Sequence, residues 1–192
     1  MKKRIAIFAS GSGSNAQKIM EHFKSSAEAE VVLILTNNPQ AYVLQRADNF
    51  EVPSHVFTRQ EFYETDDVIR LLKNLQADLI VLAGFLWLVP VSLLKAFPNK
   101  IINIHPALLP KFGGKGMYGD HVHRAVLAAK EDESGITIHF ANEHFDEGEI
   151  LHQSRFKIEP NDDLKTIKFK VQQLEHQHFP RVIEALLKKM KS

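Results

Sequence analysis

An asparagine and a histidine end an apolar segment at residues 100–105, which reads KIINIH. Its three isoleucines are typical of a strand that is covered on both faces. Side chains two residues apart on a strand share a face, so Asn103 and His105 are predicted to point the same way. An amide and an imidazole aimed at one point can donate hydrogen bonds and carry a proton. A histidine that is only hydrogen-bonded within the core remains the alternative.

A glycine-rich turn, GSGSN at residues 11–15, follows the first apolar segment and precedes an amphipathic one. Gly11 and Gly13 let the backbone turn tightly and approach an anion, and a following helix would supply free N–H groups. The turn is not the dinucleotide fingerprint, because the third glycine is missing, and it is not a P-loop, because no Gly-Lys-Ser/Thr follows. It is predicted to bind one phosphate group, and a plain strand–helix turn is the alternative.

Acidic residues surround a predicted turn at residues 144–150, HFDEGEI. They can form a solvated hairpin tip. Alternatively, one carboxylate can reach His105, orient the imidazole and raise its pKa.

The histidine pair of HVH at residues 121–123 has no third metal ligand at a clear spacing, so we expect no metal. The apolar segment LAGFLWLVP at residues 82–90 suits either core packing or a flat heterocycle.

The elements that position these residues alternate in the first hundred residues. Strands are predicted at residues 4–10, 31–38, 54–59, 78–85 and 100–105, and helices at residues 16–24, 42–50 and 61–76. This order predicts an α/β fold with a doubly wound, parallel sheet, in which ligands bind beyond the carboxyl ends of the strands.

The pattern changes in the last part of the chain, after a glycine-rich loop at residues 112–120. A short helix is expected at residues 123–130, and segments 134–141 and 148–158 alternate apolar and polar residues. This alternation predicts antiparallel strands with one face in water. A helix with Asp162 or Asp163 as its N-cap is predicted at residues 162–177, and Pro180 is predicted to end or kink it before a segment at 182–190.

Composition limits the possible classes of protein. The chain has 192 residues, 44% hydrophobic content, a formal net charge of +1 and no cysteine. These values fit one globular domain and exclude a disulfide scaffold, a thiolate metal site and a cysteine nucleophile. The charge lacks the basic bias of a nucleic-acid-binding protein.

The N-terminal segment is predicted to be the first strand, not a signal peptide. No apolar stretch is long enough to span a membrane. We therefore expect a cytoplasmic protein.

Four segments together resemble the phosphoribosylglycinamide formyltransferase family, which comprises folate-dependent enzymes of purine synthesis. The segments GSGSN, LAGF, INIHPALLP and HFDEGEI match its motifs in order and spacing, and the resemblance runs from about residue 4 to the final helix. The Asn-Ile-His-Pro motif is shared with other formyltetrahydrofolate enzymes, and GSGSN is the more specific element. We expect neither the C-terminal barrel of methionyl-tRNA formyltransferases nor the regulatory domain of formyltetrahydrofolate deformylases.

The resemblance implies a Rossmann-like formyltransferase fold over residues 1–192, with a nucleotide-binding half at about 1–100 and a folate-binding, catalytic half at about 101–192. It implies that 10-formyltetrahydrofolate, as cosubstrate, formylates the amine of N1-(5-phospho-D-ribosyl)glycinamide in purine (IMP) biosynthesis. That chemistry needs an oxyanion donor, a proton carrier and a charge partner. The residues implied as catalytic are Asn103, His105 and Asp146. The residues implied for the ribonucleotide are Gly13, Ser14, Asn15, Gln172 and Glu175. The residues implied for folate are Arg59, Leu86, Trp87, Leu88, Val89, Asn103, Asn142, Glu143, His144, Phe145 and Asp146.

The chain departs from the family pattern at three places, one of which is the loop FGGKGMYGDHVH, longer and more glycine-rich than in some relatives. The family has Met-Arg-Ile-Leu after LAGF, where this chain has LWLV, and Ala107 stands where serine is common. The resemblance also implies a cis peptide bond between Leu109 and Pro110. The partners expected are small-molecule substrates, without nucleic acid or membrane, for a monomer or homodimer. A hydrolase that releases formate and a catalytically inactive nucleotide-binding module are the alternative functions.

Overall fold

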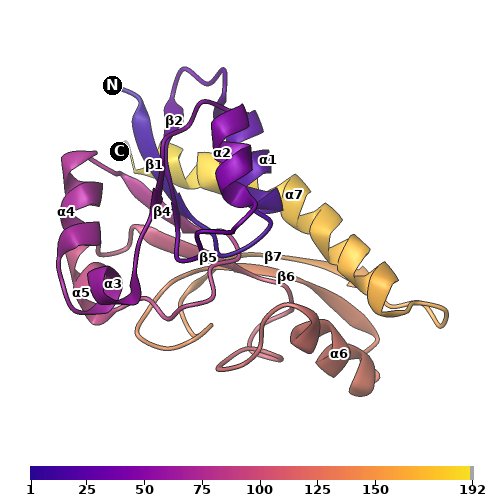
Figure 1. Ribbon diagram of the computed structural model, residues 1–192. Coiled ribbons are helices and arrows are strands. Elements are labelled where there is room, and N and C mark those ends of the chain that lie inside the picture. The colour runs from indigo at the N-terminus through magenta and orange to yellow at the C-terminus, as the bar shows by residue number, and fades with distance from the viewer. Residues whose placement is uncertain (191–192) are drawn as a thin grey trace.

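The computed structural model describes residues 1–190, and one seven-stranded sheet runs through it (Figure 1). Its strands are β1 (Lys3–Phe8), β2 (Ala29–Thr36), β3 (Ser54–Val56), β4 (Leu79–Leu82), β5 (Ile101–His105), β6 (Glu133–Phe140) and β7 (Ile150–Lys157). Their order is β3-β2-β1-β4-β5-β6-β7, with parallel pairing from β3 to β5, and β6 pairs antiparallel with both β5 and β7. The predicted α/β fold, a mostly parallel sheet with an antiparallel C-terminal part, is confirmed.

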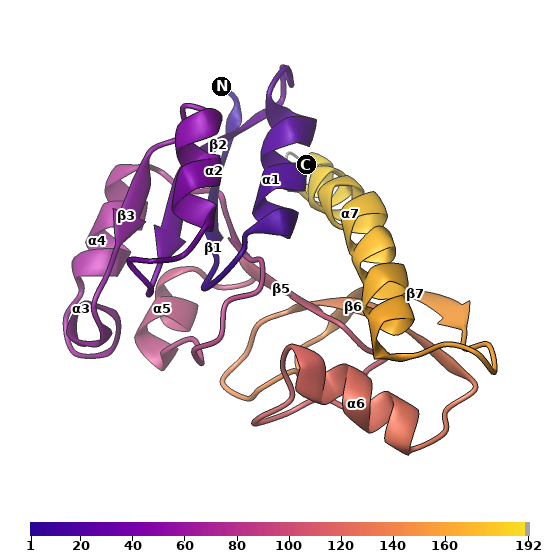
Figure 2. The ribbon, with the colours of Figure 1, turned by 45° about the vertical axis from the view of Figure 1, so that its right-hand side comes forward.

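Helices cover both faces of this sheet (Figures 1 and 2). They are α1 (Ser14–Phe23), α2 (Val43–Asn49), α3 (Arg59–Tyr63), α4 (Asp67–Asn74), α5 (Val91–Ala96), α6 (Asp120–Ala128) and α7 (Leu164–Lys189). Buried residues of α1, α2 and α7 form one core, and those of α3, α4 and α5 form the other. Successive β1 residues alternate between the two cores, with Ile5 in the first and Ala6 in the second. The apolar runs of the parallel strands therefore reflect burial on both sides.

The segment at residues 61–76 forms two helices, so the prediction of one helix there was wrong. Thr58 begins α3 with a capping box, in which its hydroxyl accepts from the N–H of Glu61 (3.2 Å) and its own N–H donates to the Glu61 carboxylate (2.6 Å). The hydroxyl of Thr65 then accepts from the N–H of Asp67 (3.3 Å), just where α4 begins. Such side-chain bonds to the backbone compete with helical hydrogen bonds and divide the segment. The early cap also ends β3 at Val56, short of the predicted residue 59.

Strand β6 is buried on both faces, so the prediction of a face in water was wrong for this strand. Its apolar residues, such as Ile136 and Ile138, belong to the core beneath α7. Thr137, a fully buried polar residue of β6, hydrogen-bonds within the protein. The Thr137 hydroxyl donates to the carbonyl of Ala107 (2.7 Å) and accepts from the N–H of Leu109 (3.0 Å). The polar positions of β6 therefore hold the turn that follows β5, and the predicted cis peptide bond in this turn, Leu109–Pro110, is confirmed.

Helix α7 begins as predicted from the sequence but ends later. The Asp163 carboxylate accepts from the N–H of Thr166 (2.8 Å), which confirms Asp163 as the N-cap. The helix then continues through Pro180 to Lys189, so Pro180 does not end it. Phe179 belongs to the core and Pro180 is buried as well, and packing of this kind can offset the roughly 3 kcal/mol that an interior proline costs a helix. The short helix α5 was not predicted.

Candidate active site

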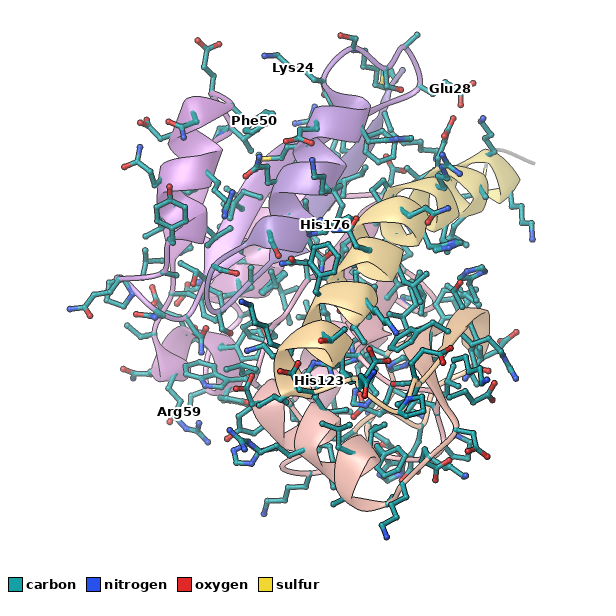
Figure 3. The ribbon with its side chains drawn as sticks, turned by 90° about the vertical axis from the view of Figure 1, so that its right-hand side faces the viewer. Lys24, Glu28, Phe50, Arg59, His123 and His176 are labelled. Atoms are coloured by element: carbon teal, nitrogen blue, oxygen red, sulfur yellow. The ribbon has the colours of Figure 1, made fainter. Side chains whose placement is uncertain are left out.

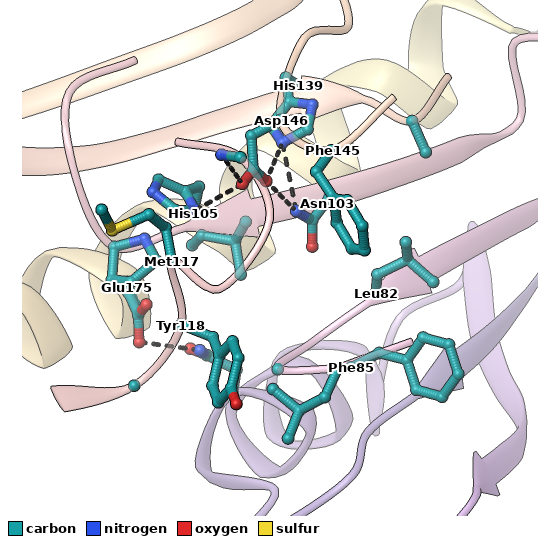
Figure 4. Close-up of a pocket in the computed structure, with 18 of the residues that line it drawn as sticks. Leu82, Phe85, Asn103, His105, Met117, Tyr118, His139, Phe145, Asp146 and Glu175 are labelled. Atoms are coloured by element: carbon teal, nitrogen blue, oxygen red, sulfur yellow. Dashed lines mark hydrogen bonds and ion pairs between the residues drawn. The ribbon is translucent and has the colours of Figure 1, made fainter. Parts of the chain in front are cut away.

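Three polar side chains converge at the carboxyl end of β5 (Figure 4). The Asn103 amide Nδ2 donates to Oδ1 of Asp146 (3.3 Å), and Nδ1 of His105 lies 3.4 Å from Oδ2 of the same carboxylate. The side chains of His105 and Asp146 are only 4% and 9% exposed, so this contact lies largely out of water. The sequence prediction that Asn103 and His105 share a face is confirmed, and so is the prediction that a carboxylate from the acidic turn reaches His105.

Burial decides the charge of the imidazole. Burial lowers the pKa of His105, and it outweighs the Asp146 carboxylate and the Phe112 carbonyl, which raise this pKa. Asp146 therefore acts on this pKa in the predicted direction, but the prediction that the pKa is raised overall was wrong, because burial has the larger effect. Burial also acts to raise the pKa of Asp146, but His139, His105 and the N–H of Gly114 together lower it. The pair thus favours an ionised carboxylate beside a neutral imidazole.

Two glycine-containing loops fix the position of the Asp146 carboxylate. Asp146 itself has a φ of 59°, in the left-handed region. At Gly148 a Cβ atom would lie 1.7 Å from the carbonyl oxygen of Phe140, so only glycine allows this turn to approach β6. On the other side, the N–H of Gly114 donates to Oδ2 of Asp146 (3.0 Å). The carbonyl of Phe112, from the same loop, lies 2.8 Å from Nε2 of His105.

His139 is a site residue that the sequence analysis missed. The β5–β6 register places His139 opposite Asn103, and its Nε2 lies 3.2 Å from the Asn103 Nδ2. Its Nδ1 lies 2.8 Å from the carbonyl of Phe140, and its Nε2 lies 3.6 Å from Oδ1 of Asp146. The available signal was a histidine at a buried position of an apolar strand, but its partner depended on an antiparallel register that the sequence does not display.

The predicted phosphate loop lies between β1 and α1. Gly13 precedes the first residue of α1 and has a φ of 70°, which glycine adopts without strain. The side chain of Asn15 donates from Nδ2 to Oε2 of Glu175 on α7 (2.9 Å), and its Oδ1 is buried without a hydrogen-bond partner among the described residues. This orphaned acceptor adjoins the cavity, where a ligand with a donor can satisfy it.

Glu175 and Gln172 line the same cavity from one side of α7. Loss of hydration raises the pKa of Glu175 to about 7, although the hydrogen bond from Asn15 lowers it. A carboxyl group with this pKa can change its charge near neutral pH when a ligand binds. Of the residues implied for the ribonucleotide, Asn15, Gln172 and Glu175 therefore line one cavity, from the N-terminal turn of α1 and from α7. Gly13 and Ser14 are not among the residues of this lining.

A cavity of about 410 Å³ connects these two groups of residues. Of the residues implied for folate, those that line it are Leu86, Trp87, Leu88, Val89, Asn103, Asn142, His144, Phe145 and Asp146. Glu143 is absent from the lining, and Arg59 lies outside, with its guanidinium 4.8 Å from the Tyr63 ring centre and 5.6 Å from that of Trp87. Residues of the lining that the sequence analysis did not assign include Met117, Tyr118, His123 and Lys168.

The histidines at 121 and 123 do not share a metal site. His123 lies where α6 meets α7 (Figure 3) and lines the cavity. The His121 ring packs on Tyr118. Over residues 1–190, no group of three or more His, Cys, Asp or Glu side chains is arranged to hold a metal ion. Within the same range, no helix has the length and apolar character needed to cross a membrane.

Known proteins resemble this chain over nearly its whole length. The sequence pattern of the formyl transferase family matches residues 3–183. The phosphoribosylglycinamide formyltransferase of Bacillus subtilis is 37% identical over 190 residues, which cover 96% of this chain and 95% of that protein. The chloroplastic phosphoribosylglycinamide formyltransferase of Arabidopsis thaliana is 40% identical over 191 residues, which cover 96% of this chain but 65% of the plant protein. The crystal structure of phosphoribosylglycinamide formyltransferase from Bacillus halodurans matches with a TM-score of 0.87 and 38% identity, over 98% of this chain and 97% of that one.

Proposed function

Because the chain belongs to the formyl transferase family, we propose that it acts as a phosphoribosylglycinamide formyltransferase. The reaction moves the formyl group of 10-formyltetrahydrofolate to the amine of N1-(5-phospho-D-ribosyl)glycinamide. A bond forms between the amine nitrogen and the formyl carbon, the bond from that carbon to N10 of folate breaks, and one proton passes from the amine to N10. The products are formylglycinamide ribonucleotide and tetrahydrofolate, in de novo purine (IMP) biosynthesis.

The observation that carries this proposal is the convergence of Asn103 and His105 on Asp146 inside the cavity. Acyl transfer places negative charge on the formyl oxygen, and donors fixed in advance at that point stabilise the charge. The Asn103 Nδ2 carries two hydrogens, so it can keep its bond to Asp146 and offer the second hydrogen to the formyl oxygen in place of His139.

His105 is the proposed proton carrier. Its Nδ1 faces the Asp146 carboxylate, so a proton taken up at this nitrogen is stabilised by the adjacent negative charge. A neutral imidazole can accept the proton that the attacking amine releases, and the developing charge on the oxygen favours that protonated form. The lowered pKa of His105 therefore suits a base that is neutral before the reaction and charged during it.

The ribonucleotide is proposed to bind with its phosphate on Gly13, Ser14 and Asn15, at the N-terminus of α1, where free N–H groups favour an anion. Gln172 and Glu175 are proposed to contact the ribose and the glycinamide. This assigns most of the nucleotide site to residues of about 1–100, completed by one face of α7.

Folate is proposed to bind between Leu86–Val89 and Asn142–Asp146, largely through backbone groups. Phe85 and Trp87 line this part of the cavity with two aromatic rings, tilted by 60° to each other, and such an apolar lining suits a heterocyclic ring. Arg59 is proposed to lie near the far end of folate, held over the Trp87 and Tyr63 rings. We propose no resident metal for this reaction, and we propose that the protein works in the cytoplasm as a monomer or homodimer.

The test is to incubate the protein with both substrates and to follow tetrahydrofolate by its absorbance. Formyl transfer requires that tetrahydrofolate and formylated ribonucleotide appear in equal amounts. If formate is released without the amine acceptor, the protein is a hydrolase. If both substrates bind without turnover, it is an inactive binding module. Either result overturns the proposal.

A further inference from the structure

Helix α2 contacts the phosphate loop through the carbonyl groups of two successive peptide units. The backbone N–H of Val43 donates to the carbonyl of Gly11 (3.2 Å). The Nε–H of Arg46 donates to the carbonyl of Ser12 (2.7 Å). Both bonds join the same short helix to the turn that follows β1. Residues 11–13 are therefore held from the side of α2.

These two bonds also set the direction of the N–H groups in the loop. A peptide unit is planar and trans, so its C=O and N–H point in opposite directions. With the Ser12 carbonyl directed at Arg46, the N–H of Gly13 points away from α2. With the Gly11 carbonyl directed at Val43, the N–H of Ser12 also points away from it. Two successive amides thus point to the same side of the loop, away from α2. Successive N–H groups that point to one side can bind an anion.

Close packing prevents the loop from shifting toward α2. A Cβ atom at Gly13 would lie 2.4 Å from Cγ2 of Val43 and 3.0 Å from its Cα. The loop therefore already touches the helix, and its orientation depends on the bonds that α2 supplies.

Arg46 is held on its other side by an aromatic ring. Its guanidinium carbon lies 4.9 Å from the centre of the Tyr42 ring, a cation–π contact. Arginine stays charged at all physiological pH values, so a permanent positive charge lies beside the loop. This charge is in addition to the partial positive charge at the N-terminus of α1.

We propose that Arg46 is a positioning residue for the phosphate site, which turns the Ser12–Gly13 peptide so that its N–H faces the ligand. The inference rests on the proposed function, because it takes the anion to be the phosphate of the ribonucleotide. Arg46 acts through the loop backbone and does not touch the reacting atoms.

The test compares Arg46→Met, which removes the donor and the charge, with Arg46→Lys, which keeps both a donor and the charge. The matched control is Arg181→Met, which removes an exposed arginine charge from α7. Dissociation constants are measured calorimetrically with ribose 5-phosphate as the probe, and kcat and the KM of each substrate are measured in the formyl-transfer assay.

We expect Arg46→Met to weaken ribose 5-phosphate binding by about tenfold or more, since it removes a charge-assisted hydrogen bond. The KM of the ribonucleotide should rise by a similar factor, whereas the folate KM and kcat stay unchanged. Arg46→Lys should recover most of the affinity, and Arg181→Met should match the wild type. If the Met and Lys variants bind like the wild type, or if both substrates weaken equally in Arg46→Met, the inference is wrong.

Failure of this inference is distinguishable from failure of the proposed function. If ribose 5-phosphate binding depends on Arg46 but the wild-type protein transfers no formyl group, the inference stands and the proposed function is wrong. If the wild-type protein transfers formyl groups but Arg46→Met binds ribose 5-phosphate as well as the wild type does, the proposed function stands and the inference is wrong.

Discussion

Replacing Asp146 with asparagine removes one negative charge from the centre of the site while keeping the size of the side chain. The carboxylate lies 3.4 Å from Nδ1 of His105 and accepts hydrogen bonds from Asn103 (3.3 Å) and the N–H of Gly114 (3.0 Å). Asparagine has one acceptor oxygen and one NH₂ group, so it cannot replace all three contacts. We expect Asp146→Asn to lower kcat and to change the dissociation constants of both substrates much less.

The distance from Asp146 to His105 limits the size of this effect. Two unit charges 3.4 Å apart interact by about 5 kcal/mol at an effective dielectric constant of about 20. The substitution should lose only part of this energy, because asparagine keeps a polar oxygen that can lie beside the imidazole. A loss of about 10²–10³ in kcat, or roughly 3–4 kcal/mol, lies within this energy. The carboxylate raises the pKa of His105, so its removal lowers that pKa further and shifts the ionisation seen in the kcat profile to lower pH.

The assay follows tetrahydrofolate formation at saturating substrates over a range of pH, with kcat referred to the concentration of folded protein. Thermal unfolding is measured on the same samples, and Asp132→Asn, at an exposed position outside the cavity, serves as the control. If Asp146 only stabilises its turn, the variant melts earlier but the folded fraction keeps the wild-type kcat and pH profile. That result would refute the reasoning from charge.

Three further changes test other parts of the site. Gly13→Ala places a methyl group 2.4 Å from Val43 Cγ2, at a residue with a φ of 70°. We therefore expect the KM of the ribonucleotide to rise while the KM of folate stays nearly constant. Equal increases in both KM values would contradict the assignment of the loop. The pKa of Glu175 is raised to about 7 in the folded protein, whereas the unfolded carboxyl ionises near 4.5, so the wild type loses stability as pH rises from about 4.5 to 7. Urea unfolding should show Glu175→Gln gaining up to about 3 kcal/mol over the wild type at pH 8 but little at pH 5, and a pH-independent difference would exclude this titration. Thr137→Val leaves the N–H of Leu109 without its buried partner, and we expect the free energy of unfolding to fall by about 1–3 kcal/mol in urea titrations; an unchanged midpoint would show that the bond is replaced.

The sequence sufficed where a local pattern determines the geometry. The isoleucines of β5 identify a buried strand, and its period of two places Asn103 and His105 on one face, as observed. The turn at residues 11–15 likewise follows from its glycines and from the flanking apolar segments. In both cases the relevant residues are neighbours in the chain, so their relation does not depend on the rest of the fold.

Contacts between distant segments were out of reach of the same reasoning. His139 meets Asn103 only through the register of two antiparallel strands, and a shift of one residue would turn His139 to the other face. The direction of the His105 pKa was predicted wrongly for a related reason. The sequence displays the nearby charge of Asp146, but the extent of burial, which outweighs it, results from the packing of the whole domain.

The two groups of functional residues are supported by different parts of the fold. Asn103, His105 and Asp146 are held by β5, by β6 and by the loop that carries Gly114. The phosphate loop is held by α2, and its link to α7 is the bond from Asn15 to Glu175. A change behind the proposed phosphate loop therefore leaves the contacts of the Asp146 carboxylate in place, and a change at this carboxylate leaves α2 in place. This separation is the structural reason why binding of the ribonucleotide and the rate of the chemical step should respond to different substitutions.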